Sequence, residues 1–200
     1  MQLINSNIET VQFEGPFKSL IGNPSLAGAW LIWGQSGNGK THFMLQLMKY
    51  LTRFDRVAFN SLEEGISASL KMAFEIEKMQ ETNGKLILLD KETMEDLANR
   101  LRKRKSPNII AIDSLQYTGI NYRQYKALKE EFPKKLFLWI SHADGKLPEG
   151  RIAKKIRYDV DVKIRVAGFR AYAMSRYSNM SEPYVIWKEG AEMFEGKSIE

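Results

Sequence analysis

Short runs of hydrophobic residues alternate along the chain with longer stretches in which hydrophobic residues are spaced three or four apart. Short apolar runs that stop at polar or glycine residues are typical of strands buried on both faces. The chain has a series of such runs, each followed by polar residues or glycine. They predict five strands, at Ala29–Trp33, Val57–Phe59, Leu86–Leu89, Ile109–Ile112 and Leu136–Ile140.

Amphipathic helices are predicted between these strands. The clearest begins after Thr41, and its apolar positions recur at helical spacing, so one face should be buried. Thr93 and Asp96 resemble a capping box that opens another helix, and Pro133 limits a third over 121–132. The residues expected to face the core in the first helix, after Thr41, are Phe43, Met44, Leu47, Met48 and Leu51. A second helix is suggested by Ile66, Leu70 and Ala73 together with Met72, Ile76 and Met79.

Strands that alternate with helices of this length form β-α-β units with right-handed crossovers. The predicted fold class is therefore α/β, a three-layer α/β/α sandwich around a mainly parallel sheet. From Asp159 onward apolar and polar residues alternate, and Gly168 offers a turn before the return stretch 171–177. This pattern predicts an antiparallel hairpin at the edge of the sheet, and Tyr184–Trp187 suggests one further strand. No repeat or linker divides the chain, so 1–200 is expected to be a single domain.

The composition is that of a globular protein, with 44% hydrophobic and 27% charged residues. No apolar run approaches the roughly 18 residues of a membrane span, and Met1–Thr10 has no signal-peptide pattern, so we expect a cytoplasmic protein without membrane contact. The absence of cysteine excludes disulfides and thiolate metal sites. A net charge of +6 gives a mild attraction to polyanions, which by itself leaves nucleic-acid binding open.

A glycine-rich loop joins the first strand to the first helix and matches the P-loop pattern, two glycines four apart followed by lysine and a hydroxyl residue. Its backbone N–H groups and the helix dipole would hold phosphates, most simply those of ATP. Lys40 would reach the β- and γ-phosphates, and the Thr41 hydroxyl would ligate Mg²⁺. The predicted nucleotide-binding residues are Gly34, Gln35, Ser36, Gly37, Asn38, Gly39, Lys40, Thr41 and His42.

Acidic residues follow two of the other strands. Asp113 ends its strand at the carboxyl edge, where open α/β sheets bind ligands, and would hold Mg²⁺ through a water. Glu63 lies just past the second strand and could orient a water for attack on the γ-phosphate. Glu64 competes for this role, and either acid could instead be an ordinary helix-start carboxylate.

The chain resembles the RecA-type ATPases, the group that includes RecA, RadA, KaiC and DnaB, from about Trp30 to Phe194. Ser61-Leu62-Glu63 is similar to the S-L-E that carries the catalytic glutamate in DnaB-like enzymes, which favours Glu63 over Glu64. Asp113-Ser114-Leu115-Gln116 is similar to the Walker B signature of the group. The resemblance implies ATP hydrolysis and assembly into a ring or filament.

Two further roles are implied by this resemblance alone. His142 ends the fifth strand where the group places a sensor of the γ-phosphate. Met174-Ser175-Arg176-Tyr177, together with Arg170, is similar to the R-x-x-x-K-N-R-F of RadA. In this group such a basic pair acts on the ATP of the neighbouring subunit, so Arg176 is expected to act in trans. Met174 replaces the lysine of that pattern, which leaves one charge of the pair and puts the rate of turnover in question.

The stretch 145–158 resembles a loop of RadA that faces DNA in recombinases, so DNA, single-stranded in preference, is the expected partner. Tyr117, Tyr122 and Tyr125 could stack on bases, although this spacing is more often core packing. A second basic run, 100–105, is more simply read as a solvated helix end. The predicted nucleic-acid contacts are Lys146, Arg151, Lys154, Lys155 and Arg157.

The resulting hypothesis is a Mg²⁺-dependent ATPase of DNA recombination, repair or replication. Two alternatives remain. One is a nucleotide-gated assembly or regulatory module with little turnover. The other is a small-molecule P-loop kinase, against which the S-L-E element and the hairpin argue. Neither a zinc module nor an extra helical domain accompanies the core, so the sequence does not indicate the process served or the oligomer number.

Overall fold

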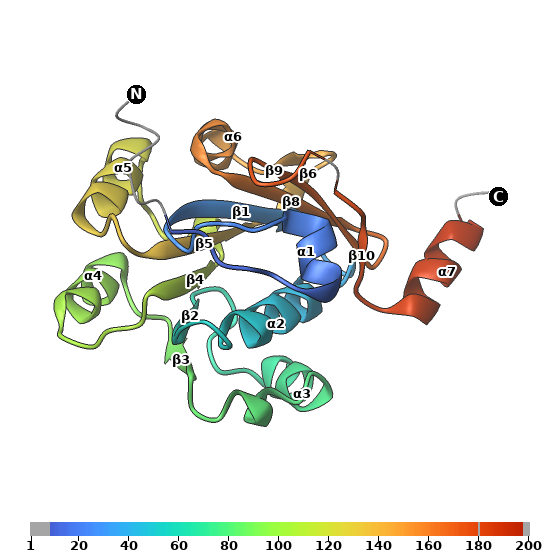
Figure 1. The fold of residues 1–200 in the computed structure, drawn as a ribbon, viewed down its shortest axis with the longest axis horizontal. Coiled ribbons are helices and arrows are strands. Elements are labelled where there is room, and N and C mark those ends of the chain that lie inside the picture. Colours follow the sequence, from blue (N-terminus) through green and yellow to red (C-terminus); the bar gives the residue numbers. More distant parts are fainter. Residues whose placement is uncertain (1–8, 180, 198–200) are drawn as a thin grey trace.

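The computed structural model describes residues 9–179 and 181–197. Its centre is a twisted, mostly parallel eight-stranded sheet with the order β10-β9-β8-β1-β5-β4-β2-β3 (Figure 1). A separate two-stranded ribbon pairs β6 with β7. The strands are β1 Gly28–Gly34, β2 Val57–Ser61, β3 Leu86–Asp90, β4 Ile109–Asp113, β5 Leu136–Ser141, β6 Ala143–Asp144, β7 Leu147–Pro148, β8 Val162–Ala167, β9 Arg170–Ser175 and β10 Tyr184–Val185.

Helices cover both faces of the sheet (Figure 1). One face is covered by α1 Gly15–Ile21, α2 Lys40–Leu51 and α3 Ala68–Ile76, and the other by α4 Met94–Arg102, α5 Tyr122–Glu131 and α6 Arg151–Asp159. The last helix, α7 Lys188–Lys197, lies to one side of these layers. None of the helices in residues 9–179 and 181–197 combines the length and apolar character needed to cross a membrane.

The central strand β1 shows why the apolar runs lack alternation. Trp30 and Ile32 point into the core beneath α2, whereas Leu31 and Trp33 point into the core beneath α5 and α6. Because both faces of this strand are buried, every position favours an apolar side chain. The parallel pairing of β1 with β5 and β8 brings the carboxyl ends of these strands to one edge. That edge carries the polar residues that follow each strand.

The predicted α/β/α fold with a mainly parallel sheet and an antiparallel hairpin is confirmed. The five predicted strands are β1 to β5, and the hairpin is β8 and β9, with β10 lying outside it as the edge strand. The expected loop at 145–158 is wrong, because this segment forms the β6–β7 turn and α6. Ala153 and Ile156 of α6 are fully buried, and their helical spacing is concealed in the sequence by the basic residues between them.

The first helix, α1, has no counterpart among the predicted elements. Gly15 and Pro16 open it and resemble a turn in the sequence, although proline is well tolerated in the first turn of a helix. The helix indicated by Ile66, Leu70 and Ala73 is present as α3, but Ile66 precedes it and is 66% exposed. The apolar spacing alone therefore overestimated the buried face of α3.

Candidate active site at the carboxyl edge of the sheet

The P-loop connects the end of β1 at Gly34 to the start of α2 at Lys40. Gly37 and Gly39 have φ angles of 75° and 88°, which side chains rarely adopt, so the loop requires glycine at both positions. Gly34 is required for a different reason: a Cβ atom there would lie 2.5 Å from the carbonyl oxygen of Val166 in β8. The glycines of the motif thus fix both the bend of the loop and its close packing against the neighbouring strand.

Asn38 fastens the P-loop to the turn between β8 and β9. Its Oδ1 atom accepts a hydrogen bond of 2.8 Å from the N–H of Gly168, and its carbonyl oxygen accepts one of 3.2 Å from the N–H of Phe169. Phe169 has a φ of 56° and lines the nucleotide cavity. The turn between these strands, far from the P-loop in sequence, is therefore part of the site.

A cavity of about 330 Å³ lies over the P-loop and gathers most of the predicted catalytic and nucleotide-binding residues. Lys40 donates a hydrogen bond of 3.2 Å to the Gly34 carbonyl oxygen, so its ammonium group rests on the loop itself. Burial lowers the pKa of Lys40, and the nearby carboxylates of Asp113 and Glu63 oppose this effect. The residues that the sequence analysis singled out and that line the cavity are Gln35, Ser36, Gly37, Gly39, Lys40, Thr41, His42, Glu63, Glu64, Asp113 and His142.

Asp113 is the most perturbed acid of the site. Burial raises its pKa to about 6, Lys40 and His142 oppose the rise, and Glu63 and Glu64 add to it. A carboxylate and the Thr41 hydroxyl on one cavity wall are hard oxygen donors, the type that Mg²⁺ prefers. A dication there would offset the charge that burial disfavours. The residues present therefore fit Mg²⁺, and their ligand roles remain a prediction.

The raised pKa of Asp113 predicts that Asp113→Asn stabilises the nucleotide-free protein. When the pKa of a carboxyl group is higher in the folded than in the unfolded protein, the folded protein becomes less stable as the pH rises from about 4 to about 6. A rise from 3.8 to about 6 corresponds to about 3 kcal/mol once the group is fully charged. Urea unfolding at pH 8 without nucleotide should show this gain, and the gain should shrink as pH falls toward 4.

The exposed Asp144 provides the matched control for this measurement. Asp144→Asn removes a carboxylate at the same end of the sheet, but one that is exposed and forms an ion pair of 3.2 Å with Lys154. We expect it to change the free energy of unfolding by less than about 1 kcal/mol. If Asp113→Asn were less stable than the unaltered protein at pH 8, the inference that the buried Asp113 carboxylate destabilises the nucleotide-free protein would be wrong.

The two competing glutamates have different partners. The Oε2 atom of Glu63 lies 2.8 Å from Nε2 of His142, which joins the end of β2 to the end of β5. Glu64 instead accepts hydrogen bonds from the hydroxyls of Ser67 and Ser69 at the start of α3, at 2.9 and 3.0 Å. Glu63 therefore lies with the predicted sensor, whereas Glu64 supports the beginning of a helix. This difference favours Glu63 as the base, and the role itself remains a prediction.

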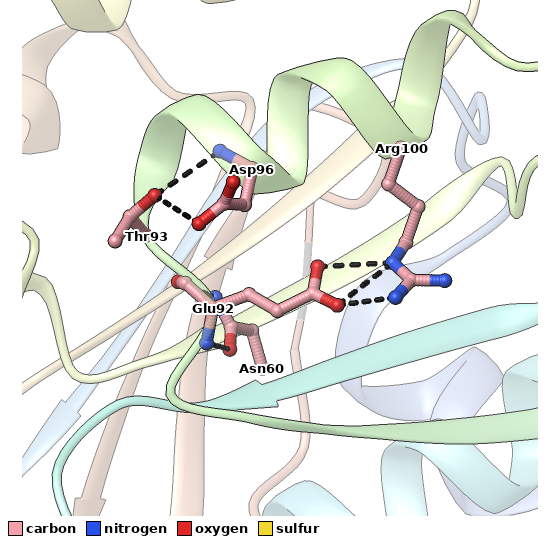
Figure 2. Close-up of polar contacts among 5 residues, drawn as sticks. All are labelled: Asn60, Glu92, Thr93, Asp96 and Arg100. Carbon is pink, nitrogen blue, oxygen red and sulfur yellow. Dashed lines mark hydrogen bonds and ion pairs between the residues drawn. The ribbon is translucent and has the colours of Figure 1, made fainter.

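The loop that carries the glutamates rests on the end of β3. Figure 2 shows Asn60 of β2, which is fully buried and forms two hydrogen bonds with the backbone of Glu92, to its carbonyl at 2.8 Å and from its N–H at 3.1 Å. The Glu92 carboxylate in turn accepts hydrogen bonds from the guanidinium of Arg100, while Thr93 caps α4. Asp90 then accepts a hydrogen bond of 3.2 Å from the N–H of Ile66 in the glutamate loop. The buried amide thus helps to fix the position of the acids.

Arg176 lies at the opposite edge of the sheet. It follows β9, whose last residue Ser175 pairs with Val162 at the amino end of β8. Its guanidinium forms an ion pair of 3.0 Å with Asp161. Since β1 extends seven residues between the two edges, about 20 Å separates Arg176 from the P-loop of the same chain. Arg176 cannot reach its own nucleotide cavity, so any role in ATP hydrolysis would have to be in trans, and that role remains a prediction.

The predicted nucleic-acid contacts lie on α6 and on the turn of the β6–β7 ribbon. Lys146, Arg151 and Lys155 are exposed, whereas Lys154 pairs with Asp144. Arg157 stacks on the Trp33 ring, with 5.7 Å between its guanidinium carbon and the ring centre, so it belongs partly to the core. Fewer of the predicted basic residues are therefore freely exposed than the sequence indicated, and their contact with nucleic acid remains a prediction.

Other expected contacts have structural explanations. Tyr125 is fully buried against Trp139 and donates a hydrogen bond of 2.7 Å to Asp159, so it cannot stack on a base. In the basic run 100–105, Arg100 and Arg102 are paired with Glu92 and Glu131. The contacts of Tyr125, Arg100 and Arg102 support the simpler interpretation of each feature. His42 lies 2.7 Å from Glu77 and links α2 to the end of α3, while it also lines the nucleotide cavity, so its predicted contact with nucleotide remains a prediction.

Some residues of the site escaped the sequence analysis. Phe169 and Ser69 line the cavity, but neither belongs to a motif, and both arrive through folding of distant segments. Gln116, within the Walker B-like signature, donates a hydrogen bond of 2.8 Å to the Ser141 hydroxyl and thereby ties the ends of β4 and β5 together. Its place in that signature was the signal that could have indicated this contact.

Comparison with known proteins identifies the fold. No family model matches the chain. No curated protein matches it either. Among solved structures, it is similar to the flagellar accessory protein FlaH from Methanocaldococcus jannaschii, with 15% identity, a TM-score of 0.60, and 88% of this chain and 93% of that one covered.

A second solved structure shares the same architecture. This KaiC-like protein from Pyrococcus horikoshii OT3 has 18% identity and a TM-score of 0.61, over 88% of this chain and 94% of that one. A third, solved as an ATPase domain, has 17% identity and a TM-score of 0.57, over 82% of this chain and 78% of that one. The chain therefore has the fold of the RecA-like P-loop ATPases.

Proposed function

We propose that this protein is a Mg²⁺-dependent ATPase of the RecA-like type that acts on DNA in the cytoplasm, in recombination, repair or replication. One observation carries the enzymatic part: Lys40, Asp113, Glu63 and His142 come from four separate segments and meet at one cavity over the P-loop. A P-loop that only held phosphate would not require the Glu63–His142 pair beside it.

In this proposal the triphosphate of ATP lies along the P-loop, and Lys40 leaves the Gly34 carbonyl for the β- and γ-phosphate oxygens. Glu63 accepts a proton from a water molecule as the water oxygen bonds to the γ-phosphorus. The bond from that phosphorus to the β–γ bridging oxygen breaks, and ADP leaves with the electron pair. His142, in contact with Glu63, holds the carboxylate in place.

Thr41 and Asp113 would hold Mg²⁺, which supplies charge compensation for the phosphates when bound. The raised pKa of Asp113 keeps this carboxyl group partly protonated near pH 6 in the free protein. Metal-dependent nucleotide binding should therefore strengthen as pH rises through this range.

The DNA partner is supported by the exposed basic residues of α6 and the β6–β7 turn. A triple replacement of Lys146, Arg151 and Lys155 with alanine is expected to weaken single-stranded DNA binding by about tenfold or more. Three lost phosphate contacts should also reduce the salt slope of binding by about 2. Fluorescence anisotropy of a labelled oligonucleotide over a range of salt concentrations measures both quantities.

The matched control replaces Lys103, Arg104 and Lys105, the other basic cluster, with alanine. This variant removes the same charge from the end of α4 and should keep most of the DNA affinity. ATP hydrolysis with and without single-stranded DNA tests the wider proposal. Equal DNA binding by both triple variants, or no stimulation of hydrolysis by DNA, would remove DNA from the proposed function.

A second candidate is a nucleotide-gated assembly or regulatory module that hardly turns ATP over. It is favoured by Met174, which replaces a charge that the RecA-type pattern expects, and by the similarity to a protein described as a flagellar accessory protein. Tight ATP binding combined with a hydrolysis rate that does not respond to Glu63→Gln would support this candidate over the enzyme.

A further inference from the structure

The β8–β9 hairpin places a lysine beside the position where the RecA-type pattern has lost one. Lys163 of β8 is the direct cross-strand partner of Met174 in β9. Arg176 is the first residue after β9 and lies two residues beyond Met174; its N–H donates a hydrogen bond of 3.1 Å to the carbonyl oxygen of Asp161, which extends the strand pairing by one residue. Lys163, Met174 and Arg176 therefore share one face of the sheet at its amino edge.

The distances of a β-sheet make Lys163 a geometric substitute for a lysine at 174. Residues two apart on one strand are separated by about 6.6 Å. Diagonal neighbours across a strand pair, such as Lys163 and Arg176, lie about 7–8 Å apart. A four-carbon side chain spans the remaining difference. An ammonium group from Lys163 can thus occupy the region beside Arg176 that a lysine at 174 would occupy.

The surroundings of this pair suit an anionic ligand. Lys163, Met174 and Arg176 line a cavity of about 420 Å³ together with hydroxyl and amide side chains such as Ser175 and Asn179, and with one carboxylate, that of Asp161. Lys163 is half-buried, and no carboxylate in the described part of the chain forms an ion pair with it. The Arg176 guanidinium forms an ion pair with Asp161, and its side chain is still 61% exposed. Two cations therefore face one hollow, and neither is fully neutralised.

The complementary surface exists on the same chain, at the other edge of the sheet. The nucleotide cavity contains the acids Glu63, Glu64 and Asp113, and a bound triphosphate would add further negative charge. Because the two surfaces lie on opposite edges, they can meet only between two copies. Charge complementarity thus selects a second copy of this chain as the occupant.

We propose that Lys163 is the second cation of the site that acts in trans. Its ammonium group and the Arg176 guanidinium together contact the γ-phosphate oxygens of the ATP bound to the neighbouring copy, where negative charge develops as the bond to the bridging oxygen breaks. Lys163 forms no covalent bond and transfers no proton. The assignment rests on the proposed ATPase function and adds a residue that the sequence motif does not contain.

Moving the charge across the strand pair tests this assignment. Lys163→Met should lower kcat for ATP hydrolysis by about tenfold or more, while the Kd for ATP stays within about threefold. The double variant Lys163→Met/Met174→Lys returns the charge from the partner strand and should restore kcat to within about threefold of the unaltered protein. A purely structural role of Lys163 would not be rescued by a lysine on the other strand. Lys134→Met, an exposed lysine at the same edge, is the control and should leave kcat unchanged.

Mixing variants tests the action between copies. Lys40→Ala copies keep the cationic pair but lack the nucleotide site, whereas Lys163→Met copies keep the nucleotide site. An equimolar mixture should hydrolyse ATP faster than either variant alone. The assignment would be overturned if Lys163→Met left kcat unchanged, if the double variant did not recover activity, or if mixing gave no gain. Hydrolysis by the unaltered protein would still support the proposed ATPase in each of these cases. Absence of hydrolysis by the unaltered protein would overturn the proposed function and this assignment with it.

Discussion

Replacing Lys40 with alanine is expected to weaken ATP binding by at least about 100-fold and to abolish hydrolysis. Lys40 is half-buried and lines the cavity, and within the described part of the chain its ammonium group donates a hydrogen bond to the Gly34 carbonyl oxygen. Hydrogen bonds between charged groups contribute about 1.5–3 kcal/mol each, and Lys40 would form at least two of them with the β- and γ-phosphates. Isothermal titration calorimetry with ATP and Mg²⁺ measures the loss directly.

Lys49 is the matched control, since it lies on the same helix but outside the cavity, paired with Glu81 at 2.6 Å. Lys49→Ala should bind ATP as the unaltered protein does. Thermal unfolding without nucleotide checks that both variants are folded. Undiminished ATP affinity in a folded Lys40→Ala protein would show that the P-loop does not hold the triphosphate, and the proposed function would then be wrong.

Glu63→Gln is expected to reduce kcat by a factor of about 100–1,000 while the Kd for ATP changes by less than about threefold. Glutamine keeps the size and hydrogen-bonding ability of the side chain beside His142, but it cannot accept a proton from water. The loss should therefore appear in the chemical step. Single-turnover hydrolysis together with a separate binding titration separates the two quantities.

Glu64→Gln distinguishes the two adjacent acids under the same conditions. Its carboxylate is engaged by Ser67 and Ser69, so we expect a decrease in kcat of less than about tenfold. The reverse order of effects would move the base to Glu64. If neither variant were slower than the unaltered protein, the chain would be better described as a nucleotide-gated module.

Local patterns predicted most of the fold because the central strands are buried on both faces. In β1 the run Ala29–Trp33 and in β5 the run Leu136–Ile140 are buried at every position and wholly apolar, and the helices between the strands keep a visible apolar stripe. The order of the strands could not be predicted in this way, since β1 contacts β5 and β8 through pairings between distant segments. In α6 the two buried residues are too few to reveal a helix among basic neighbours.

The same distinction applies to the site. Lys40 and Asp113 follow from motifs in which backbone shape and chemistry are encoded within a few residues. Phe169 reaches the cavity because Asn38 of the P-loop binds the turn between β8 and β9, a contact that no local pattern announces. The proposed role of Lys163 likewise could not be predicted from the sequence, because it depends on the strand register that pairs Lys163 with Met174.

The separation of Arg176 from the P-loop also limits the symmetry of any working assembly. A two-fold dimer could pair the unlike edges only by setting both pairs at once in one antiparallel interface. A head-to-tail contact between unlike edges instead points every copy in the same direction. In an open row, one terminal copy would keep an incomplete cavity and the other an idle guanidinium. The number of complete sites would then be one fewer than the number of copies, unless the row closes on itself.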